Sequence, residues 1–233
     1  MDFQTLKYKI KSLPLVGSTY DALIGNRKVE RIKAARKAAL KEYGNDVLQA
    51  VGEVMDELRV DWYVDYGSLL GIIRDGHFIE YDDDLDFAFF SADPALWSRM
   101  EEAFAKRGMK KVRSITYNGQ LEEMTFAHHD LTFDLFRHWR ENGQNLAYCF
   151  YNKPGVEYPG PNMYSPVLLK HYDFAQTRPM SYDGLEIRVP SEPEKYLASV
   201  YTDNWRIPDP NWKAGMSPGW NDLEGLATID YWQ

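Results

Sequence analysis

Asp82-Asp83-Asp84-Leu85-Asp86 places four carboxylates within five residues and runs directly into the apolar stretch Phe87-Ala88-Phe89-Phe90. In a strand, side chains at positions i and i+2 point to the same face, so Asp84 and Asp86 would project together. Carboxylates so close repel one another unless a cation lies between them, and hard divalent cations prefer oxygen ligands. We therefore predict that Asp84 and Asp86 bind Mg²⁺ or Mn²⁺.

Two other structures can carry such a run of acids. A calcium-binding loop of the helix–loop–helix type has glycine at its sixth position, where Phe87 stands in this chain, so that pattern is absent. A solvent-exposed acidic turn is the other alternative, because runs of charge usually face water. The apolar residues on either side of the run, Phe78-Ile79 and Phe87 to Phe90, argue against it.

A small-residue turn lies upstream at Gly67-Ser68, before the helix-like stretch from Leu69 to Arg74. Such a turn offers main-chain N–H groups to a phosphate with no bulky side chain in the way, and serine adds a hydroxyl. The planar guanidinium of Arg74 also suits phosphate oxygens. We predict that Gly67, Ser68 and Arg74 contact phosphate. The alternatives are an ordinary strand-to-helix turn and a surface ion pair of Arg74.

A later carboxylate, Asp134, stands in the apolar run Leu131-Thr132-Phe133-Asp134-Leu135-Phe136. Burying a carboxylate is costly unless it is paired or bound to a metal. If its strand lies beside Asp84 and Asp86, three carboxylates converge, and Asp134 either completes the metal shell or accepts a proton. An aspartate on the wet face of an edge strand is the alternative.

Composition limits the classes of protein to which the chain can belong. It has 233 residues, of which 44% are apolar and 15% aromatic, enough for a real core. The net charge of −8 argues against nucleic acid as a partner. The single Cys149 excludes an internal disulfide. Because we find no signal peptide and no apolar run long enough to cross a membrane, we expect a cytoplasmic protein.

The charge is distributed unevenly along the chain. Residues 1–43 contain ten Lys or Arg against four Asp or Glu, a net charge of +6, which leaves −14 for the remainder. A basic, partly amphipathic segment is compatible with peripheral contact at the inner face of an anionic membrane. A solvated helix face explains the same pattern.

The order of the predicted elements indicates an α+β fold, with a mixed sheet flanked by helices. Periodicity predicts helices over 27–42 and 46–58, separated by Gly44 and Asn45, with an apolar face from Val47 to Leu58. Residues 152–166 resemble a loop. We divide the chain into a basic helical segment, 1–44, and a catalytic domain, 45–233. The remaining predicted elements are strands over 61–66, 85–90, 111–117, 123–128, 131–136, 146–151 and 185–189, and helices over 69–74, 94–107 and 193–202.

The run from Asp65 to Asp86, DYGSLLGIIRDGHFIEYDDDLD, resembles the signature of the LicD family of transferases, which includes fukutin and fukutin-related protein. The family pattern is a Gly-Ser or Gly-Thr turn, an Arg-x-Gly-x-Phe-Ile run and then Asp-Asp-Asp-x-Asp. The resemblance continues at Phe133 to Phe136 and at Tyr182 to Tyr201. Thr202 stands where the family often has glycine.

The resemblance implies a nucleotidyltransferase-like fold that uses a CDP-alcohol donor. The family moves a phospho-alcohol, such as phosphocholine, ribitol phosphate or glycerol phosphate, onto a sugar hydroxyl and releases CMP. Its bacterial members act on surface glycans such as teichoic acid, capsule or lipopolysaccharide. The zinc site of the fukutin-related branch is not carried over, because this chain has one cysteine.

Two other functions stay open on the sequence alone. The same turn and acids could transfer a nucleotide from ATP or CTP to a small acceptor, a reaction that leaves diphosphate. The chain could also be an inactive glycan-binding module, with its many Trp and Tyr residues stacking on sugars. The clustered acids argue against this second alternative, because an inactive module has no need of such costly charge.

Overall fold

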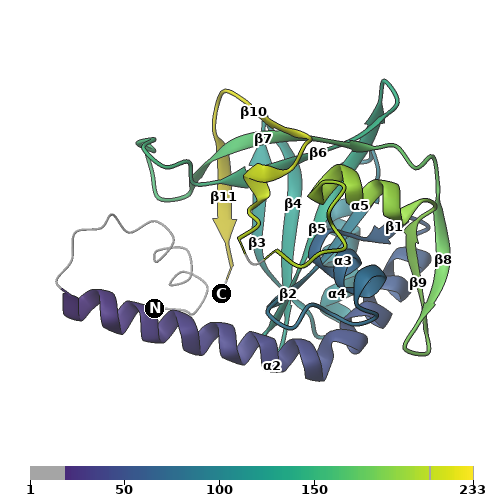
Figure 1. Ribbon diagram of the computed structural model, residues 1–233, viewed down its shortest axis with the longest axis horizontal. Coiled ribbons are helices and arrows are strands. Elements are labelled where there is room, and N and C mark those ends of the chain that lie inside the picture. Colours follow the sequence, from purple (N-terminus) through teal and green to yellow (C-terminus); the bar gives the residue numbers. More distant parts are fainter. Residues whose placement is uncertain (1–18, 210, 233) are drawn as a thin grey trace.

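The computed structural model describes residues 19–209 and 211–232, with side chains from residue 29 onward. Helices and strands alternate in the first half of the chain, and strands dominate the second (Figure 1). The helices are α2 (Thr19–Glu57), α3 (Tyr66–Arg74), α4 (Leu96–Lys106) and α5 (Pro193–Tyr201), with a 3-10 turn η1 (Ala214–Met216). The strands are β1 (Asp61–Val64), β2 (Asp84–Phe90), β3 (Lys110–Tyr117), β4 (Gln120–His128), β5 (Leu131–Glu141), β6 (Gln144–Tyr151), β7 (Met163–Tyr172), β8 (Thr177–Tyr182), β9 (Leu185–Pro190), β10 (Trp220–Asp222) and β11 (Ala227–Tyr231).

Nine of these strands form one sheet, in the order β1-β2-β5-β4-β3-β11-β7-β10, and β6 pairs with both β5 and β7. Six strands, β3 to β7 and β11, close into a ring of antiparallel pairings, which removes their exposed edges. The pairing of β2 with β5 is parallel. Helices together with a largely antiparallel sheet confirm the predicted α+β class.

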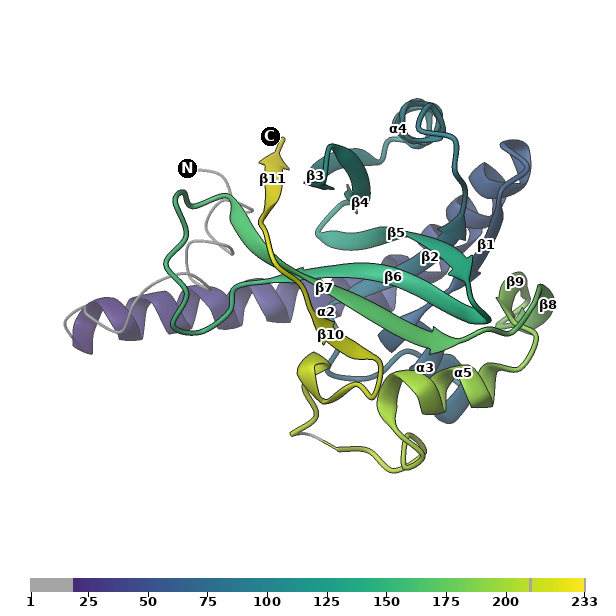
Figure 2. The ribbon, with the colours of Figure 1, turned by 90° about the horizontal axis from the view of Figure 1, so that it is seen from above.

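The helices cover both faces of the sheet. Figure 2 shows α4 on one face and α3 with α5 on the other. Helix α2 contacts α4, β2, β5 and β9, while its N-terminal half projects beyond the sheet (Figure 1). The predicted apolar face of α2 is confirmed, because Val47, Leu48, Val51, Val54 and Met55 are at most 1% exposed.

The predicted helix break at Gly44-Asn45 is wrong, because α2 runs continuously from Thr19 to Glu57. Gly44 instead allows a close approach, since a Cβ there would lie 2.5 Å from a ring carbon of Phe78. Asn45 donates a 2.5 Å hydrogen bond to Asp183 in the β8–β9 turn. Packing of this kind offsets the cost of about 1 kcal/mol that glycine imposes inside a helix.

Most predicted elements lie where expected, but four strands were missed. The predicted loop over 152–166 ends inside β7, which begins at Met163, and β8, β10 and β11 had no prediction. Strands β10 and β11 are held by partners distant in sequence, so local periodicity says little about them, whereas β7 pairs with the preceding strand β6 as well as with β10 and β11. Strand β8 contains Pro179, which usually signals irregular structure but is accepted in a two-stranded hairpin.

The division of the chain at residue 44 falls inside α2, and it stays a prediction. The predicted membrane contact of residues 1–43 also stays a prediction, and residues 1–18 lie outside the described part of the chain. Within the described residues, no helix combines the length and apolar character needed to cross a membrane.

Candidate active site

The parallel pairing of β2 with β5 brings two of the predicted carboxylates together. Asp86 lies directly opposite Asp134 in the register, and Asp84 lies opposite Thr132. Strand β5 lies between β2 and β4, so the alternative of an edge strand for Asp134 is wrong. Because paired residues of neighbouring strands point to the same face, Asp84, Asp86 and Asp134 share one face of the sheet.

The surroundings of Asp86 disfavour its ionised form. Burial raises the pKa of Asp86 well above its usual range, and the nearby carboxylates of Asp84, Asp134 and Asp82 raise it further. Two like charges in a low-dielectric site cannot both ionise cheaply. The four aspartates of the run are only partly exposed and Leu85 between them is buried, so the run is not a fully solvated turn.

Asp134 belongs to a network of buried polar groups at the centre of the sheet. Its Oδ1 atom accepts hydrogen bonds from the Thr125 hydroxyl and, at 3.0 Å, from Arg113. Arg113 also pairs with Glu123, whose pKa is raised to about 7, chiefly by burial. The Arg113 guanidinium thus compensates part of the charge of the carboxylates around it.

Helix α3 places Gly67 and Ser68 beside the acidic run. The predicted turn at these residues is wrong in detail, because α3 already begins at Tyr66. Asp65 caps the helix by accepting the Tyr66 N–H at 2.7 Å, and the first ladder bond runs from Leu69 N–H to the Asp65 carbonyl at 2.9 Å. The N–H groups of Gly67 and Ser68 lie between these two bonds, at the end of the helix that favours anions.

Both residues of this helical turn contact the acidic run. The Ser68 hydroxyl is buried and accepts the main-chain N–H of Asp86 at 2.9 Å, which ties α3 to β2. A Cβ at Gly67 would lie 2.7 Å from the Oδ2 atom of Asp82, so this carboxylate occupies the space that a side chain would need. Burial, together with Asp84 and Asp83, raises the pKa of Asp82 to about 7.

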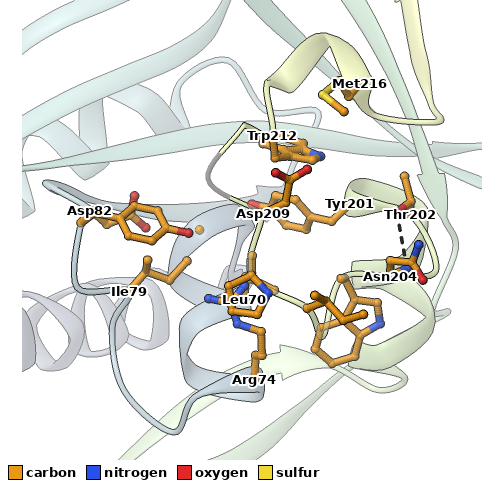
Figure 3. A pocket seen from close by; sticks show the side chains of 15 residues that line it. Leu70, Arg74, Ile79, Asp82, Tyr201, Thr202, Asn204, Asp209, Trp212 and Met216 are labelled. Carbon is orange, nitrogen blue, oxygen red and sulfur yellow. Dashed lines mark hydrogen bonds between the residues drawn. The ribbon is translucent and has the colours of Figure 1, made fainter.

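A cavity of about 600 Å³ opens beside Gly67 (Figure 3). Leu70 and Arg74 from α3 line one side, and Trp212 and Met216 line the opposite side. Asp82 lies at one end of the cavity. The other rings and acids of the wall are Tyr81, Tyr201, Trp205 and Asp209.

The cavity does not contain all of the predicted site residues. Gly67 and Arg74 line it, while Ser68, Asp84, Asp86 and Asp134 are outside its described lining. The ion pair that was the alternative to a phosphate contact of Arg74 is present, because the guanidinium donates to both carboxylate oxygens of Asp75, at 2.9 and 2.7 Å. The guanidinium nevertheless remains in the cavity wall.

A metal site requires several ligands grouped around one point. Among the described residues, no three His, Cys, Asp or Glu side chains are grouped closely enough to hold an ion. The chemistry of the donors still fits a hard divalent cation, because carboxylates of one strand and its parallel neighbour share a face and Asp86 lies near the carboxylates of Asp84, Asp134 and Asp82. Metal binding by Asp84, Asp86 and Asp134 therefore stays a prediction.

A second, buried polar cluster is centred on Asp65, the residue that caps the N-terminus of α3. The Tyr196 hydroxyl of α5 donates to Asp65 Oδ1 at 2.7 Å, and His138 Nε2 lies 3.4 Å from Asp65 Oδ2. Tyr63 links His138, at 2.7 Å, to Asn145, at 2.9 Å. This cluster connects β1, β5, β6 and α5 to the residue that caps α3.

The raised pKa of Asp65 predicts that the stability of the protein depends on pH. Burial raises its pKa to about 7, against about 4 in the unfolded chain. Stability linked to Asp65 is thus fully present below pH 4, declines as pH rises, and is lost above pH 7. Asp65→Asn keeps the cap and should therefore gain stability relative to wild type at pH 8 more than at pH 5, measured by urea unfolding. An equal shift at both pH values, or no difference from the exposed control Asp130→Asn, contradicts this assignment.

The backbone at Thr202 has a conformation that favours glycine. Thr202 ends α5 with φ of 78° and lies in the wall of the cavity. Glycine adopts such a φ without steric cost, whereas a β-branched residue is strained there. The position where relatives often have glycine is therefore one whose backbone favours glycine.

Sequence reasoning missed several residues of the site. Arg36 was assigned to a basic helix face, but it is 2% exposed and lies 3.6 Å from Asp83. Nothing in the sequence around Arg113 or Glu123 indicates a role in the site, because their partners come from other strands. The role of Asp65 could have been found, since aspartate immediately before a helix is a typical cap.

The family model described as LicD/FKTN/FKRP, nucleotidyltransferase domain, matches residues 59–192. Two relatives, each named ribitol-5-phosphate transferase FKTN, come from Macaca fascicularis and Homo sapiens. Both are 22% identical over 195 residues, which cover 83% of this chain and 40% of their own length. The chain thus spans less than half of these relatives.

Two solved structures of ANT(2")-Ia show a weaker likeness. The crystal structure in complex with adenylyl-2"-tobramycin has a TM-score of 0.39 and 12% identity, covering 72% of this chain and 80% of the other. The solution structure has a TM-score of 0.38 and 13% identity, covering 70% and 73%. Scores this low support no argument about this chain. The family match, which spans more than half of the sequence and contains the α3–β2 motif and Asp134, shows that the chain belongs to the LicD/FKTN/FKRP nucleotidyltransferase-domain family.

Proposed function

We propose that this protein is a metal-dependent phosphotransferase, which moves a phospho-alcohol from a CDP-alcohol to a hydroxyl of a cell-surface glycan and releases CMP. The observation that carries the proposal is the register of Asp86 with Asp134, beside the N-terminal turn of α3. Membership of the family supports it, as does the name of the fukutin relatives, ribitol-5-phosphate transferase. The alcohol in this chain's donor is left open among choline, ribitol and glycerol.

The carboxylates of β2 and β5 would hold the metal. Asp84 and Asp86 offer oxygen ligands from one strand, and Asp134 offers a third from the neighbouring strand. A bound Mg²⁺ or Mn²⁺ would supply positive charge to the phosphate oxygens during transfer. Arg113 and Thr125 hold Asp134 through its Oδ1 atom and so orient the side chain.

The residues of α3 would bind the diphosphate. The N–H groups of Gly67 and Ser68 lie in the first helical turn, where anions are favoured, and the Ser68 hydroxyl holds that turn against β2. Arg74 lies in the wall of the cavity and would compensate charge on the departing CMP. The cavity beside it, with the rings of Trp205 and Trp212, would enclose the rest of the donor.

In the proposed reaction, the acceptor hydroxyl oxygen bonds to the phosphorus that carries the alcohol. The bond from that phosphorus to the bridging oxygen breaks, and the bridging oxygen leaves with CMP. The hydroxyl proton passes to a carboxylate and from there to water; Asp134 is our candidate for this role, as the alternative to its role as the third metal ligand. Positioning and charge compensation provide most of the rate gain in such transfers.

Product analysis tests the proposal directly. The protein is incubated with Mg²⁺ and CDP-choline, CDP-ribitol or CDP-glycerol, and CMP is measured by chromatography in the presence and absence of a mixture of glycans. We expect metal-dependent CMP release and stabilisation against heat by one of these donors. Release of diphosphate from CTP or ATP instead would support nucleotide transfer, and no turnover with glycan binding retained would support an inactive module. Either result overturns the proposal.

A further inference from the structure

A second cavity, of about 360 Å³, lies on the far side of the segment that joins α3 to β2. Its walls come from α2, from residues 77–80 of that segment and from the β8–β9 turn. Ile79 and Asp82 line both this cavity and the larger one beside Gly67. The two cavities are therefore neighbours, separated by the segment that leads into the acidic run.

The walls of this second cavity are held by specific contacts from α2. Gly44 allows the ring of Phe78 to pack against the helix, and Asn45 bonds Asp183 at 2.5 Å. Arg36 lies 3.6 Å from Asp83, next to the shared residue Asp82. These contacts explain why α2, which supplies no residue to the predicted metal site, is joined to the segment beside it.

The side chains of the second cavity determine which ligands suit it. Four carboxylates line it, against two ammonium groups and His77, so a phosphate or a sugar acid would meet net repulsion. The carboxylates are those of Glu42, Glu80, Asp82 and Asp183, and the ammonium groups are those of Lys37 and Lys41. A neutral ligand with many hydroxyls can use both the acceptors and the donors of such a wall.

Two aromatic rings complete the wall. Phe78 and Tyr182 lie with their ring centroids 5.7 Å apart, and both are partly exposed. Ring faces pack well against the C–H faces of a sugar, while the surrounding polar groups bind its hydroxyls. Mixed polar groups around partly exposed rings are the chemistry expected for a carbohydrate.

We propose that this cavity binds a neutral sugar unit of the acceptor glycan. The inference rests on the proposed function only in assigning the sugar to the acceptor, because this cavity adjoins the larger cavity, proposed to hold the donor, at Asp82. Sugar binding by itself depends only on the walls described above. It can therefore be tested without turnover.

The experiment uses the full chain and saturation-transfer NMR, with methyl glucoside, methyl galactoside and methyl N-acetylgalactosaminide as neutral probes. Glucose 6-phosphate and glucuronic acid serve as anionic probes. We expect transfer to at least one neutral probe and weaker transfer to both anions. Tyr182→Ala should weaken the binding of the neutral sugars about three- to tenfold. Lys37→Ala should also weaken the binding of the neutral sugars. The matched control is Lys33→Ala, one helical turn earlier on an exposed position.

The outcomes separate this inference from the proposed function. Donor binding is followed in the same variants by thermal stabilisation with CDP-choline, CDP-ribitol and CDP-glycerol, which Tyr182→Ala should leave unchanged. Sugar binding that persists while no CDP-alcohol binds would overturn the proposed function and retain the sugar site. Absence of transfer to every neutral probe, stronger binding of the anions, or equal effects of Lys33→Ala and Lys37→Ala would overturn the sugar site. If Tyr182→Ala does not fold, the comparison of Lys37→Ala with Lys33→Ala decides alone.

Discussion

Asp86→Asn is expected to reduce CMP release about a thousandfold and, at the same time, to make the metal-free protein more stable. Activity falls because the carboxylate is a proposed metal ligand, and an amide is a poor ligand for a hard cation. Stability rises because Asp86 is a half-buried carboxylate whose pKa is raised by desolvation and by the neighbouring carboxylates of Asp84, Asp134 and Asp82. The amide keeps the shape of the side chain and removes the charge.

The sign of the stability change depends on pH. A raised pKa means that the folded chain holds a proton which the unfolded chain releases, so wild-type stability is lost as pH rises. The advantage of Asp86→Asn should therefore be larger at pH 8 than at pH 5, as a higher urea midpoint with an unchanged slope. Added Mg²⁺ should stabilise the wild type and leave the variant unaffected.

The matched control is Asp56→Asn, an exposed carboxylate on α2. It should change neither turnover nor the effect of Mg²⁺. Turnover retained in Asp86→Asn would remove this residue from the proposed metal site. A variant less stable than wild type at pH 8 would show that Asp86 is already well compensated in the folded protein.

Gly67→Ala should lower activity about a hundredfold without loss of folding stability. The added Cβ would lie 2.7 Å from Asp82 Oδ2, closer than a side chain can approach, so the carboxylate has to move. A displacement of about 1 Å near the reacting groups costs about a hundredfold in rate. Alanine within a helix is otherwise favoured over glycine by roughly 0.5–1 kcal/mol, which supports the folded state.

Kinetics and urea unfolding of the purified variant check this expectation together. Gly160→Ala serves as the control, because a Cβ there would meet nothing within 4 Å. A stable Gly67→Ala protein with wild-type turnover would show that the position of Asp82 does not matter for the reaction. A protein that fails to fold would show instead that the contact between α3 and the acidic run is needed for folding.

The proposed active-site motif was largely readable from the sequence because its parts are local. The acids of β2 stand two residues apart, the helix after Asp65 has helical apolar spacing, and Asp134 is conspicuous within an apolar strand. Periodicity of this kind determines which side chains share a face before any tertiary contact forms. It also identified the buried face of α2 and the overall α+β class.

The partners of these residues were not readable, since each comes from a distant part of the chain. Arg113 reaches Asp134 across β4, and Arg36 reaches Asp83 from α2. The continuity of α2 depends on Phe78, which fills the space left by Gly44. No local pattern reports a contact between residues so far apart.

The sequence by itself determined the α+β class, the apolar faces of the elements and the residue types of the predicted metal and phosphate site. Only the tertiary structure decided that β2 pairs in parallel with β5, that six strands close into a ring, and that two cavities adjoin at Asp82. The physical reason is that periodicity reflects the geometry of one element, whereas register and cavities depend on how distant elements pack.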